Sequence, residues 1–413
     1  MKILVFNVKY SENLGDGLLA QCLEKALRAR SDNIIVETID IAGRVDFGAT
    51  QRSRQLAINL LQWLPAWARR TVVQRALAPK LAKLMPRWER AMMSADAVVI
   101  GGGNLFQDDD LNFPLKIGAV LDCARGSGLP VVVHAVGVGK AWSTPARRLF
   151  GKLEDTNLKG VMVRDAGAQA NWRSHFKDGP APRRALDPGL LACDLVTPRY
   201  PDHGPYNGTV GICVTSPVIL RRHASQKAST IPLKSVKDYR ETILEFIAAG
   251  YRVRLFCDGA REDQAHLEKI VRGGEMTDLL ASGQLVTSLR PIFPAELLDI
   301  LQSTTVVVAH RLHACIAAYS LARPHVGLGW DEKVSGFFQS VDRSEFYLSG
   351  KHVTPASICA TALRAHEVGI DSRQRLAIID EARRSVSAVL DTFGWQDQRQ
   401  RPVHVRDVVS PSL

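Results

Sequence analysis

The sequence predicts an α/β protein with two Rossmann-like domains whose parallel sheets face each other across a cleft. Short, continuously apolar runs alternate with longer segments whose apolar residues recur at helical spacing, which is typical of buried parallel strands joined by helices. The 413 residues exceed what one hydrophobic core usually serves. A stretch rich in Pro and Gly, residues 197–206, separates two halves of similar pattern.

These observations predict the domain boundaries. We expect an N-terminal α/β domain over residues 1–196, a linker over 197–206, a second α/β domain over 207–393 and a polar tail over 394–413. Ligands of parallel α/β sheets bind at the carboxyl ends of the strands. Polar residues that directly follow a strand are therefore the candidate site, and the cleft between the domains is where we expect it.

The expected elements follow one another regularly along the chain. In the first half a helix is expected over residues 15–30, and strands are expected at 3–8, 34–39, 97–100, 130–136 and 160–163. In the second half strands are expected at 210–214, 252–257, 285–287, 305–309 and 324–328. The helical patterns between them cover 236–249, 262–271, 294–302 and 312–321.

The composition excludes several classes of protein. With 46% hydrophobic and 23% charged residues, the chain is not predominantly disordered. Its seven cysteines include no C-x-x-C pair, which argues for reduced thiols and against a disulfide framework or a zinc site. The apolar start lacks a signal-peptide cleavage site, and no apolar run reaches the ~18 residues of a membrane span. We expect a cytoplasmic protein.

Common nucleotide and hydrolase motifs are absent. Gly101-Gly102-Gly103 does not extend to G-x-G-x-x-G, because position 106 is Phe. Residues 137–140 resemble half of a P-loop, but His134 and Ala141 replace the Gly and the Ser or Thr that a full one needs. There is no H-E-x-x-H and no G-x-S-x-G. These absences argue against a dinucleotide oxidoreductase, a P-loop NTPase and a serine hydrolase.

Glycine clusters follow two strands of the first half. Asn13, Gly15 and Asp16 lie between the first strand and the first helix, where backbone can approach an anionic ligand or where Asn or Asp can cap the helix. The triple glycine at 101–103 follows a buried strand and leaves room for a ligand against backbone. The run 108–110 consists of three Asp residues and matches a D-x-D pattern that can hold a metal, although such loop carboxylates are more often solvated.

Cationic residues follow later strands. Arg164-Asp165 comes directly after a strand, and Asp187-Pro188 follows further on. The sharpest cluster is His310-Arg311-Leu312-His313, which opens an apolar helix, because it combines an anion-binding guanidinium with a proton carrier at a helix N-terminus. Lys333 lies 20 residues past His313 at the next strand end, so that both can face one cleft.

These clusters, taken in order, resemble the polysaccharide pyruvyl transferase family. The resemblance spans about residues 3 to 340, and the matching positions are Asn13-x-Gly15-Asp16, the triple glycine with Gln107-Asp108, Val163-Arg164-Asp165, Asp187, Arg311-Leu312-His313 and Asp331-x-Lys333. Each motif is short, whereas the ordered set is specific. The resemblance implies a fold similar to GT-B glycosyltransferases and the transfer of pyruvate from phosphoenolpyruvate to a sugar, as a ketal bridging two hydroxyls.

The resemblance also implies roles for the residues. Arg164, Arg311 and Lys333 match donor-binding positions, which suits a donor that carries both phosphate and carboxylate. His313 matches the acid–base residue, and histidine has a pKa suited to proton transfer at neutral pH. The loop residues expected to bind the acceptor or bring backbone close are Asn13, Gly15, Asp16, Gly101, Gly102, Gly103 and Asp108. The implied scheme needs no metal and no cofactor besides phosphoenolpyruvate as co-substrate.

The chain departs from the family pattern in a long basic region, which includes residues 51–94. This segment carries nine Lys and Arg residues and a single acid, Glu89, within a chain of net charge +11. One side of the predicted helix carries Val73, Leu77, Leu81, Leu84 and Trp88. The remaining circumference carries Arg75, Lys80, Lys83, Arg87 and Arg90. The pattern fits a helix lying on an anionic membrane beside a lipid-linked oligosaccharide acceptor, or a core-packed helix with a solvated basic face.

Two other functions fit parts of the sequence. A GT-B-type glycosyltransferase would share the fold and could use Glu332 to contact a nucleotide ribose, but Arg311-Leu312-His313 would then be unexplained. A basic nucleic-acid-binding protein would suit the net charge, but it should interleave basic and aromatic residues over a surface. Here the excess charge is concentrated in one segment, so we expect no nucleic-acid partner.

Overall fold

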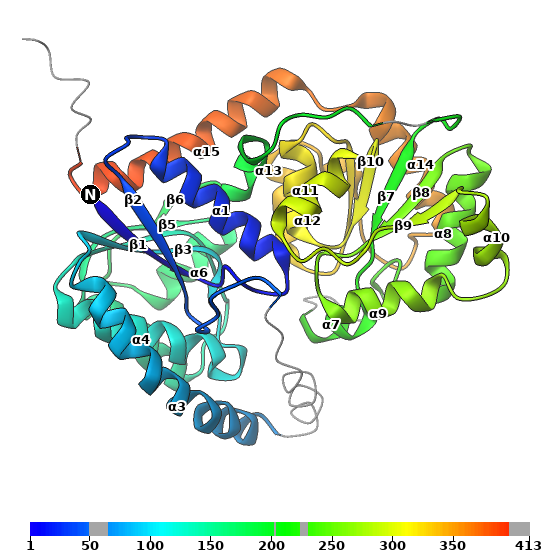
Figure 1. Ribbon diagram of the computed structural model, residues 1–413. Helices are drawn as coiled ribbons and strands as arrows, with labels where there is room; N and C mark the ends of the chain where they lie inside the picture. Colours follow the sequence, from blue (N-terminus) through cyan, green and yellow to red (C-terminus); the bar gives the residue numbers. More distant parts are fainter. Residues whose placement is uncertain (49–64, 202–203, 224–229, 396–413) are drawn as a thin grey trace, which may run out of the picture.

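The computed structural model describes residues 1–48, 65–201, 204–223 and 230–395. The chain forms two α/β halves, each built on a six-stranded sheet, and the two lie side by side (Figure 1). Every strand pairing in both sheets is parallel. The predicted architecture of two parallel-sheet halves is confirmed.

The first sheet has the strand order β2-β1-β3-β4-β5-β6. Its strands are β1 Lys2–Asn7, β2 Ile35–Asp40, β3 Ala97–Phe106, β4 Pro130–Val138, β5 Asn157–Val163 and β6 Arg183–Arg184. The helices of this half are α1 Leu14–Arg28, α3 Ala66–Met92, α4 Asn112–Ser127, α5 Thr144–Gly151 and α6 Ala166–His175, with 3-10 turns η1 Asp109–Leu111, η2 Lys152–Asp155 and η3 Pro188–Leu195.

The second sheet has the strand order β12-β11-β10-β7-β8-β9. Its strands are β7 Thr209–Cys213, β8 Arg252–Phe256, β9 Leu285–Thr287, β10 Val306–Ala309, β11 His325–Leu328 and β12 Tyr347–Leu348. The helices are α7 Pro217–His223, α8 Val236–Ala248, α9 Arg261–Ile270, α10 Glu275–Ala281, α11 Pro294–Gln302, α12 Leu312–Ser320, α13 Glu332–Ser340, α14 Pro355–Val368 and α15 Ser372–Thr392, with a 3-10 turn η5 Ser344–Phe346.

The first sheet is covered on both faces, as its continuous apolar strands predict. Successive side chains of a strand point to opposite faces. Ile3 and Val5 of β1 accordingly pack with α1 and α15, whereas Leu4 and Phe6 pack on the other face with α3 and α4. Parallel strands buried in this way contribute a large apolar area to stability.

Each sheet has a point where its strand order reverses, and ligands of such sheets bind there, beyond the carboxyl ends of the strands. In the first sheet this point lies between β1 and β3, and in the second between β7 and β10. The loop that leads into α1 leaves the first of these points, and the loop that leads into α12, at whose start Arg311 and His313 lie, leaves the second. Leu14 N–H donates to the carbonyl of Asp258 at 3.0 Å, so the two halves touch here.

Helix α15 joins the two halves a second time. It follows α14, which packs against α8, β10 and β11 of the second half, and then contacts α1, η3, β4 and β5 of the first half (Figure 1). Arg383 of α15 pairs with Asp194 at 2.7 Å. The predicted second domain, residues 207–393, includes α15, although this helix packs on the first half. The domain boundaries expected from the sequence therefore stay a proposal.

Two further expectations concern the whole chain. All seven cysteines are free thiols. Within the ranges that the structure describes, no helix combines the length and the hydropathy that a bilayer crossing requires.

Candidate active site

Eight charged or titratable residues converge where the two halves meet. We call them the interdomain cluster, and its members are Asp16, Arg164, Asp187, Asp258, Asp263, Arg311, His313 and Lys333. The first three come from the N-terminal half and the other five from the C-terminal half. The cluster includes five of the residues that the sequence predicted as site residues, and these come from four separate strand ends.

His313 occupies the centre of the interdomain cluster, in the first turn of α12. Its side chain is 11% exposed, and its Nε2 lies 3.8 Å from Oδ2 of the buried Asp187. Burial acts to lower the pKa of His313, but Asp187 and Asp16 outweigh it, so the pKa is raised. For Asp187 burial acts to raise the pKa, but His313 and Arg164 outweigh it, so the pKa is lowered. Both shifts favour a charged pair, and a protonated His313 can donate a proton.

Arg164 follows β5 and is almost fully buried, with 8% of its side chain exposed. Its Nη1 lies 3.5 Å from Asp187, and its Nε lies 3.5 Å from Asp165. Its Nη2 is buried without a hydrogen-bond partner, close to Gly137, where a Cβ would lie 3.1 Å from Nη2. A buried donor without a partner is costly, so this atom is positioned to bind an anion.

Arg311 is the N-cap residue of α12, and its guanidinium is fixed by Asp263. Asp263 is fully buried in α9 and accepts from both Nε, at 3.2 Å, and Nη2 of Arg311. The other carboxylate oxygen of Asp263 accepts the N–H of Ser216 at 2.7 Å. Because Asp263 holds two nitrogens, the plane of the guanidinium is set before any ligand binds.

Lys333 lies in the first turn of α13, and its Nζ is 3.1 Å from Asp331. Burial lowers the pKa of Lys333, and Arg164 lowers it further, whereas Asp331 acts in the opposite direction. The positive charges of Lys333 and Arg164 therefore repel each other across the boundary between the halves. An anion with two charged groups would relieve this repulsion.

The N-terminal end of α1 approaches the cluster through its backbone. A Cβ on Gly15 would lie 2.6 Å from Cγ of His313, so only glycine fits there. Asn13 is the N-cap residue of α1 but makes no capping bond with its side chain. Instead its Nδ2 donates to Asp16 at 3.4 Å, while its Oδ1 is buried without a partner. Burial raises the pKa of Asp16, although His313 acts against this.

The triple glycine has a packing role at two positions and faces the site at the third. Strand β3 continues through the three glycines to Phe106. Gly102 and Gly103 make this possible by adopting φ values of +78° and +79°, and the pairing of β3 with β4 shifts register between Gly103 and Phe106. The sequence predicted the strand to end at Ile100. A Cβ on Gly102 would collide with Leu19 of α1, whereas one on Gly103 would lie 3.8 Å from Asp16. Gly101 is confined by the His134 carbonyl, 3.3 Å from its Cβ position.

The Asp108–Asp110 run is engaged by its own surroundings. Asp108 accepts from the N–H groups of Leu111 at 3.1 Å and Ser143 at 2.7 Å. Asp109 accepts from Asn112 at 3.0 Å, and Asp110 pairs with Arg69 at 2.8 Å. In the described parts of the chain, His, Cys, Asp and Glu form no group of three or more that could hold a metal. Whether Asp108 contacts the acceptor stays a prediction.

His310, the other histidine of the sequence motif, has a structural environment. It is fully buried, and its Nε2–H donates to the Pro232 carbonyl at 2.9 Å. Burial lowers the pKa of His310 to about 4, so it remains neutral at physiological pH. Its own carbonyl accepts the indole N–H of Trp330 at 2.7 Å. His310 therefore helps to fix the loop that carries Arg311 and His313.

Sequence reasoning missed two members of the interdomain cluster, Asp258 and Asp263. Asp258 directly follows the predicted strand 252–257 and precedes a glycine, which is the same signal that marked the other strand ends. Asp263 lies inside the predicted helix 262–271 and had no such signal. Its contact with Arg311 depends on how α9 packs against α8 and β8.

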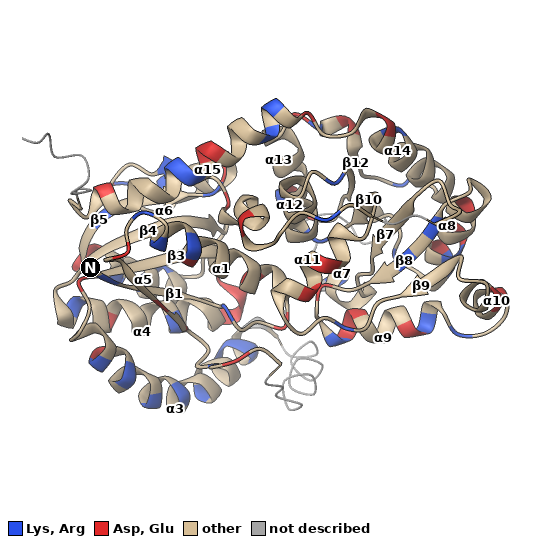
Figure 2. Cartoon of the chain, turned by 45° about the horizontal axis from the view of Figure 1, so that its top comes forward, with Lys and Arg blue, Asp and Glu red and all other residues tan. Residues whose placement is uncertain are grey.

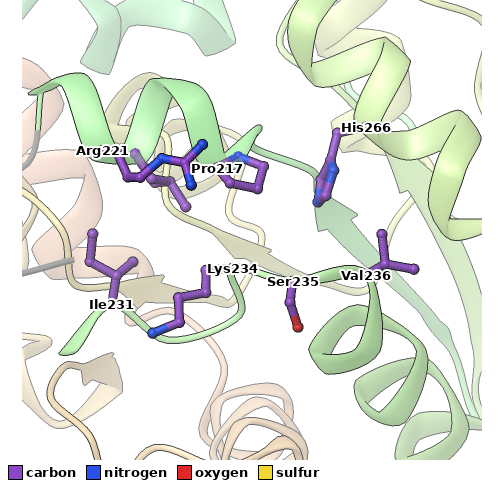
Figure 3. A pocket seen from close by; sticks show the side chains of 8 residues that line it. Pro217, Arg221, Ile231, Lys234, Ser235, Val236 and His266 are labelled. Carbon is purple, nitrogen blue, oxygen red and sulfur yellow. The ribbon is translucent and has the colours of Figure 1, made fainter. Parts of the chain in front are cut away.

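A pocket of about 520 Å³ lies beside the cluster, in the C-terminal half. Pro217 and Arg221 of α7 lie across it from Ile231 and Lys234, and His266 of α9 completes one wall (Figure 3). Its lining includes none of the predicted site residues, although Pro217 directly follows Ser216, which binds Asp263. The predicted site residues thus gather at the boundary between the halves and not in this pocket.

The two facing parallel sheets define the GT-B class of fold, with the interdomain cluster at the junction of its halves. The chain belongs to the polysaccharide pyruvyl transferase family, which it matches over residues 13–332. This match includes strands β2 to β11, which are five of the six strands of each sheet, and every member of the interdomain cluster except Lys333, which immediately follows it.

Solved structures of similar fold include two kinds of nucleotide-sugar enzyme. A UDP-glucosyltransferase from Polygonum tinctorium has a TM-score of 0.51 and 12% identity, covering 96% of this chain and 99% of that one. The UDP-GlcNAc 2-epimerase of Neisseria meningitidis has a TM-score of 0.52 and 11% identity, with 95% and 99% coverage. The UDP-GlcNAc 2-epimerase of Methanocaldococcus jannaschii has a TM-score of 0.53 and 10% identity, covering 95% of this chain and 100% of that one. These similarities concern the fold alone. No curated protein sequence matches the chain.

Proposed function

We propose that this protein transfers pyruvate from phosphoenolpyruvate to two hydroxyls of a saccharide, forming a ketal during the synthesis of an exopolysaccharide or another cell-surface polysaccharide. The observation that carries the proposal is the convergence of Arg164, Arg311 and Lys333 on His313 between the two halves of the molecule. Phosphoenolpyruvate carries its phosphate and its carboxylate on the same carbon atom, and this arrangement of cations suits both groups.

Arg164 and Lys333 together form the stronger part of the proposed donor site. The Nη2 of Arg164 is buried without a partner, and Lys333 faces it with a lowered pKa. A dianionic ligand between them would supply the missing hydrogen bond and favour the charged form of Lys333. Arg311, held flat by Asp263, would offer a second guanidinium to the other anionic group.

His313 would then act on the methylene carbon of the donor. Its raised pKa favours the protonated form, which can deliver a proton to that carbon. The neighbouring carbon becomes an oxocarbenium-like centre that a sugar hydroxyl attacks. Phosphate then leaves, and the fixed cations stabilise the charge that develops on it. The scheme uses phosphoenolpyruvate as co-substrate and requires neither a resident cofactor nor a metal.

The acceptor is proposed to be a lipid-linked oligosaccharide at the cytoplasmic face of a membrane, and α3 supports this. Leu81 and Trp88 of α3 are buried against the first sheet, with Leu77 and Leu84 partly buried beside them. The opposite side of the helix is exposed and basic (Figure 2). The apolar side is therefore occupied by protein, and any membrane contact would be electrostatic, supplemented by the exposed Trp67 at the start of the helix. Residues 51–64 of the basic segment lie outside the described residues.

Phosphate release from phosphoenolpyruvate tests the proposal. The purified protein is incubated with phosphoenolpyruvate and a panel of methyl glycosides of glucose, galactose and N-acetylmannosamine, and products are identified by mass and NMR. We expect an acceptor-dependent release of phosphate and a ketal methyl signal with at least one acceptor, both lost in His313→Ala. Transfer from a UDP-sugar to the same acceptors, without use of phosphoenolpyruvate, would favour the glycosyltransferase alternative instead.

A further inference from the structure

Asp258 is a buried carboxylate without a hydrogen-bond partner at the junction of the two halves. Asp258 directly follows β8 and is only 1% exposed. Neither oxygen of its carboxylate has a hydrogen-bond partner. Its backbone carbonyl, in contrast, accepts the N–H of Leu14 from the other half at 3.0 Å. A hydrogen bond therefore fixes the backbone of Asp258, whereas no hydrogen bond offsets the burial of its carboxylate. Burying an unpaired carboxylate is strongly unfavourable, so its presence here calls for a specific use.

The groups that face Asp258 come from three helices. Arg311 and His313 belong to the start of α12, Asp263 to α9 and Asp16 to α1, and burial raises the pKa of Asp258 to about 7 although Arg311 and His313 act against it. The thiols of Cys213 and Cys257 are also near, and both are uncharged at neutral pH because burial raises their pKa. A carboxyl group with a pKa near 7 can both accept and donate a proton at physiological pH.

The other carboxylates of the interdomain cluster already have partners. Asp263 binds Arg311 and the N–H of Ser216. Asp187 accepts the N–H of Gly189 at 2.9 Å and faces Arg164 and His313. Asp16 accepts from Asn13. Asp258 alone among the cluster's carboxylates has neither a hydrogen bond nor an ion pair within the described structure.

Ketal formation needs more than one proton carrier. Two hydroxyls must each lose a proton, the methylene carbon must gain one, and phosphate must leave with one. His313 can serve one hydroxyl and the methylene carbon, but a single group cannot be protonated for the carbon and unprotonated for the hydroxyl in the same step. A second group is needed beside the first.

We propose that Asp258 is this second proton carrier, accepting the proton of the first acceptor hydroxyl and later returning it to the departing phosphate. The inference rests on the proposed function. Strand order supports the pairing, because β10 and β8 flank β7, so Asp258 and the Arg311-His313 loop emerge from the same edge of the sheet. Arg311 faces Asp258, which places the carboxyl beside the cation proposed to bind an anionic group of the donor.

The proton transfers balance over the whole reaction. In the first step protonated His313 gives its proton to the methylene carbon, the first hydroxyl oxygen bonds to the adjacent carbon, and Asp258 takes that hydroxyl's proton. In the second step the bond from this carbon to the phosphate oxygen breaks, and the second hydroxyl oxygen bonds in its place. His313 then recovers a proton from the second hydroxyl, and Asp258 gives its proton to phosphate. Both residues return to their starting states.

The substitution Asp258→Asn tests this assignment, because it keeps the shape of the side chain but removes its ability to accept a proton. We expect kcat for phosphate release to fall by at least ~100-fold. We also expect phosphoenolpyruvate to bind several-fold more tightly, because a negative charge beside its site is removed. A structural defect would instead weaken binding of phosphoenolpyruvate. Glu268→Gln, an acid-to-amide change at an exposed position of the neighbouring helix α9, is the matched control and should change neither quantity.

A second measurement needs no acceptor. Calorimetric titration of phosphoenolpyruvate at pH 8, in buffers of different ionisation enthalpy, gives the number of protons taken up on binding. At pH 8 the wild type should take up part of a proton more than Asp258→Asn, since the bound anion raises the pKa of the nearby carboxyl. The fraction of Asp258 that remains unprotonated in this complex is the form that accepts the hydroxyl's proton. Equal proton uptake, or an unchanged kcat in an active preparation, would overturn the role of Asp258. A wild type that neither binds nor consumes phosphoenolpyruvate would instead refute the proposed function.

Discussion

The imidazole of His313 packs directly against the backbone of Gly15, at a distance that leaves no room for a side chain. A Cβ on Gly15 would lie 2.5 Å from Cβ and 2.6 Å from Cγ of His313. Gly15 begins the helix of one half, and His313 begins a helix of the other. The position of the proposed acid–base residue therefore depends on a glycine nearly 300 residues away in sequence, and on the two halves being in contact.

Gly15→Ala should reduce activity while preserving the fold. The added methyl group displaces His313 or separates the halves, and a displacement of about 1 Å in an active site can cost 100-fold in rate. Gly126→Ala is the control, because nothing lies within 4 Å of its Cβ position in helix α4. That change should leave kcat unaltered and stabilise the helix by about 0.5–1 kcal/mol. Equal kcat values for the two variants would show that His313 does not depend on Gly15.

Asp187→Asn should change the pH dependence of the reaction. Asp187 contributes to the raised pKa of His313, so its neutralisation lowers that pKa and deprotonates His313 at a lower pH. The high-pH limb of the kcat/KM profile should therefore move to lower pH, with a loss of activity that is largest above neutrality. In a His313→Ala background the same change should have little further effect, since the two residues act as a unit. A profile that keeps its wild-type high-pH limb would contradict this coupling.

Arg164→Met should weaken the binding of phosphoenolpyruvate. A hydrogen bond to a charged group contributes about 1.5–3 kcal/mol, which corresponds to a roughly 10- to 100-fold rise in Kd. Isothermal titration calorimetry with phosphoenolpyruvate measures this Kd directly. Arg148→Met, which changes an exposed arginine of α5, should leave the Kd unaltered. If Arg164→Met bound the substrate as tightly as the wild type, Arg164 would not belong to the donor site.

Asp258→Asn should stabilise the free protein, and the gain should depend on pH. The folded pKa of Asp258 is raised to about 7, whereas an unfolded Asp has a pKa of about 3.9. Its effect on stability is thus absent below pH ~4 and becomes unfavourable as the pH rises towards 7, by about 1.4 kcal/mol per pH unit. The melting temperature of the variant should exceed that of the wild type at pH 8 and match it at pH 4. A pH-independent difference would mean that Asp258 does not titrate within this range.

Charge reversal on α3 should abolish binding to anionic vesicles. The variant changes Arg75, Lys80, Lys83 and Arg87 to Glu, and vesicle flotation compares phosphatidylcholine with and without phosphatidylglycerol. Each basic residue near such a surface contributes about 1 kcal/mol. The control reverses four exposed arginines elsewhere, Arg147, Arg148, Arg373 and Arg384, and so has the same net charge. Equal flotation of both variants would remove the membrane from the proposal.

Most of the fold could be predicted, because buried parallel strands have a strong and local signal. The expected strands at 3–8, 130–136 and 252–257 all lie within one or two residues of β1, β4 and β8. Strands β6 and β12 have two residues each and were not predicted, since so short a segment has no pattern. Helix α15 was also missed, although Ile379, Ala382, Val386 and Val389 recur at helical spacing and are all buried.

The site could be predicted only in part, because strand ends mark candidates but not their partners. Arg164, Arg311, His313 and Lys333 were identified by position, and the structure brings them together. The fixing of Arg311 by Asp263 depends on tertiary packing that no sequence pattern contains. The expected end of β3 at Ile100 was wrong because glycines with positive φ continue the strand to Phe106.

Helix α15 has a mechanical consequence for how substrates reach the interdomain cluster. The chain leaves the first half after η3, which ends at Leu195, and returns to it after α14, which ends at Val368. A body attached at two points turns freely only about the line that joins them. We therefore expect an opening that separates His313 from Gly15 to be a rotation about this axis, because both connections restrain sliding or twisting of one half against the other.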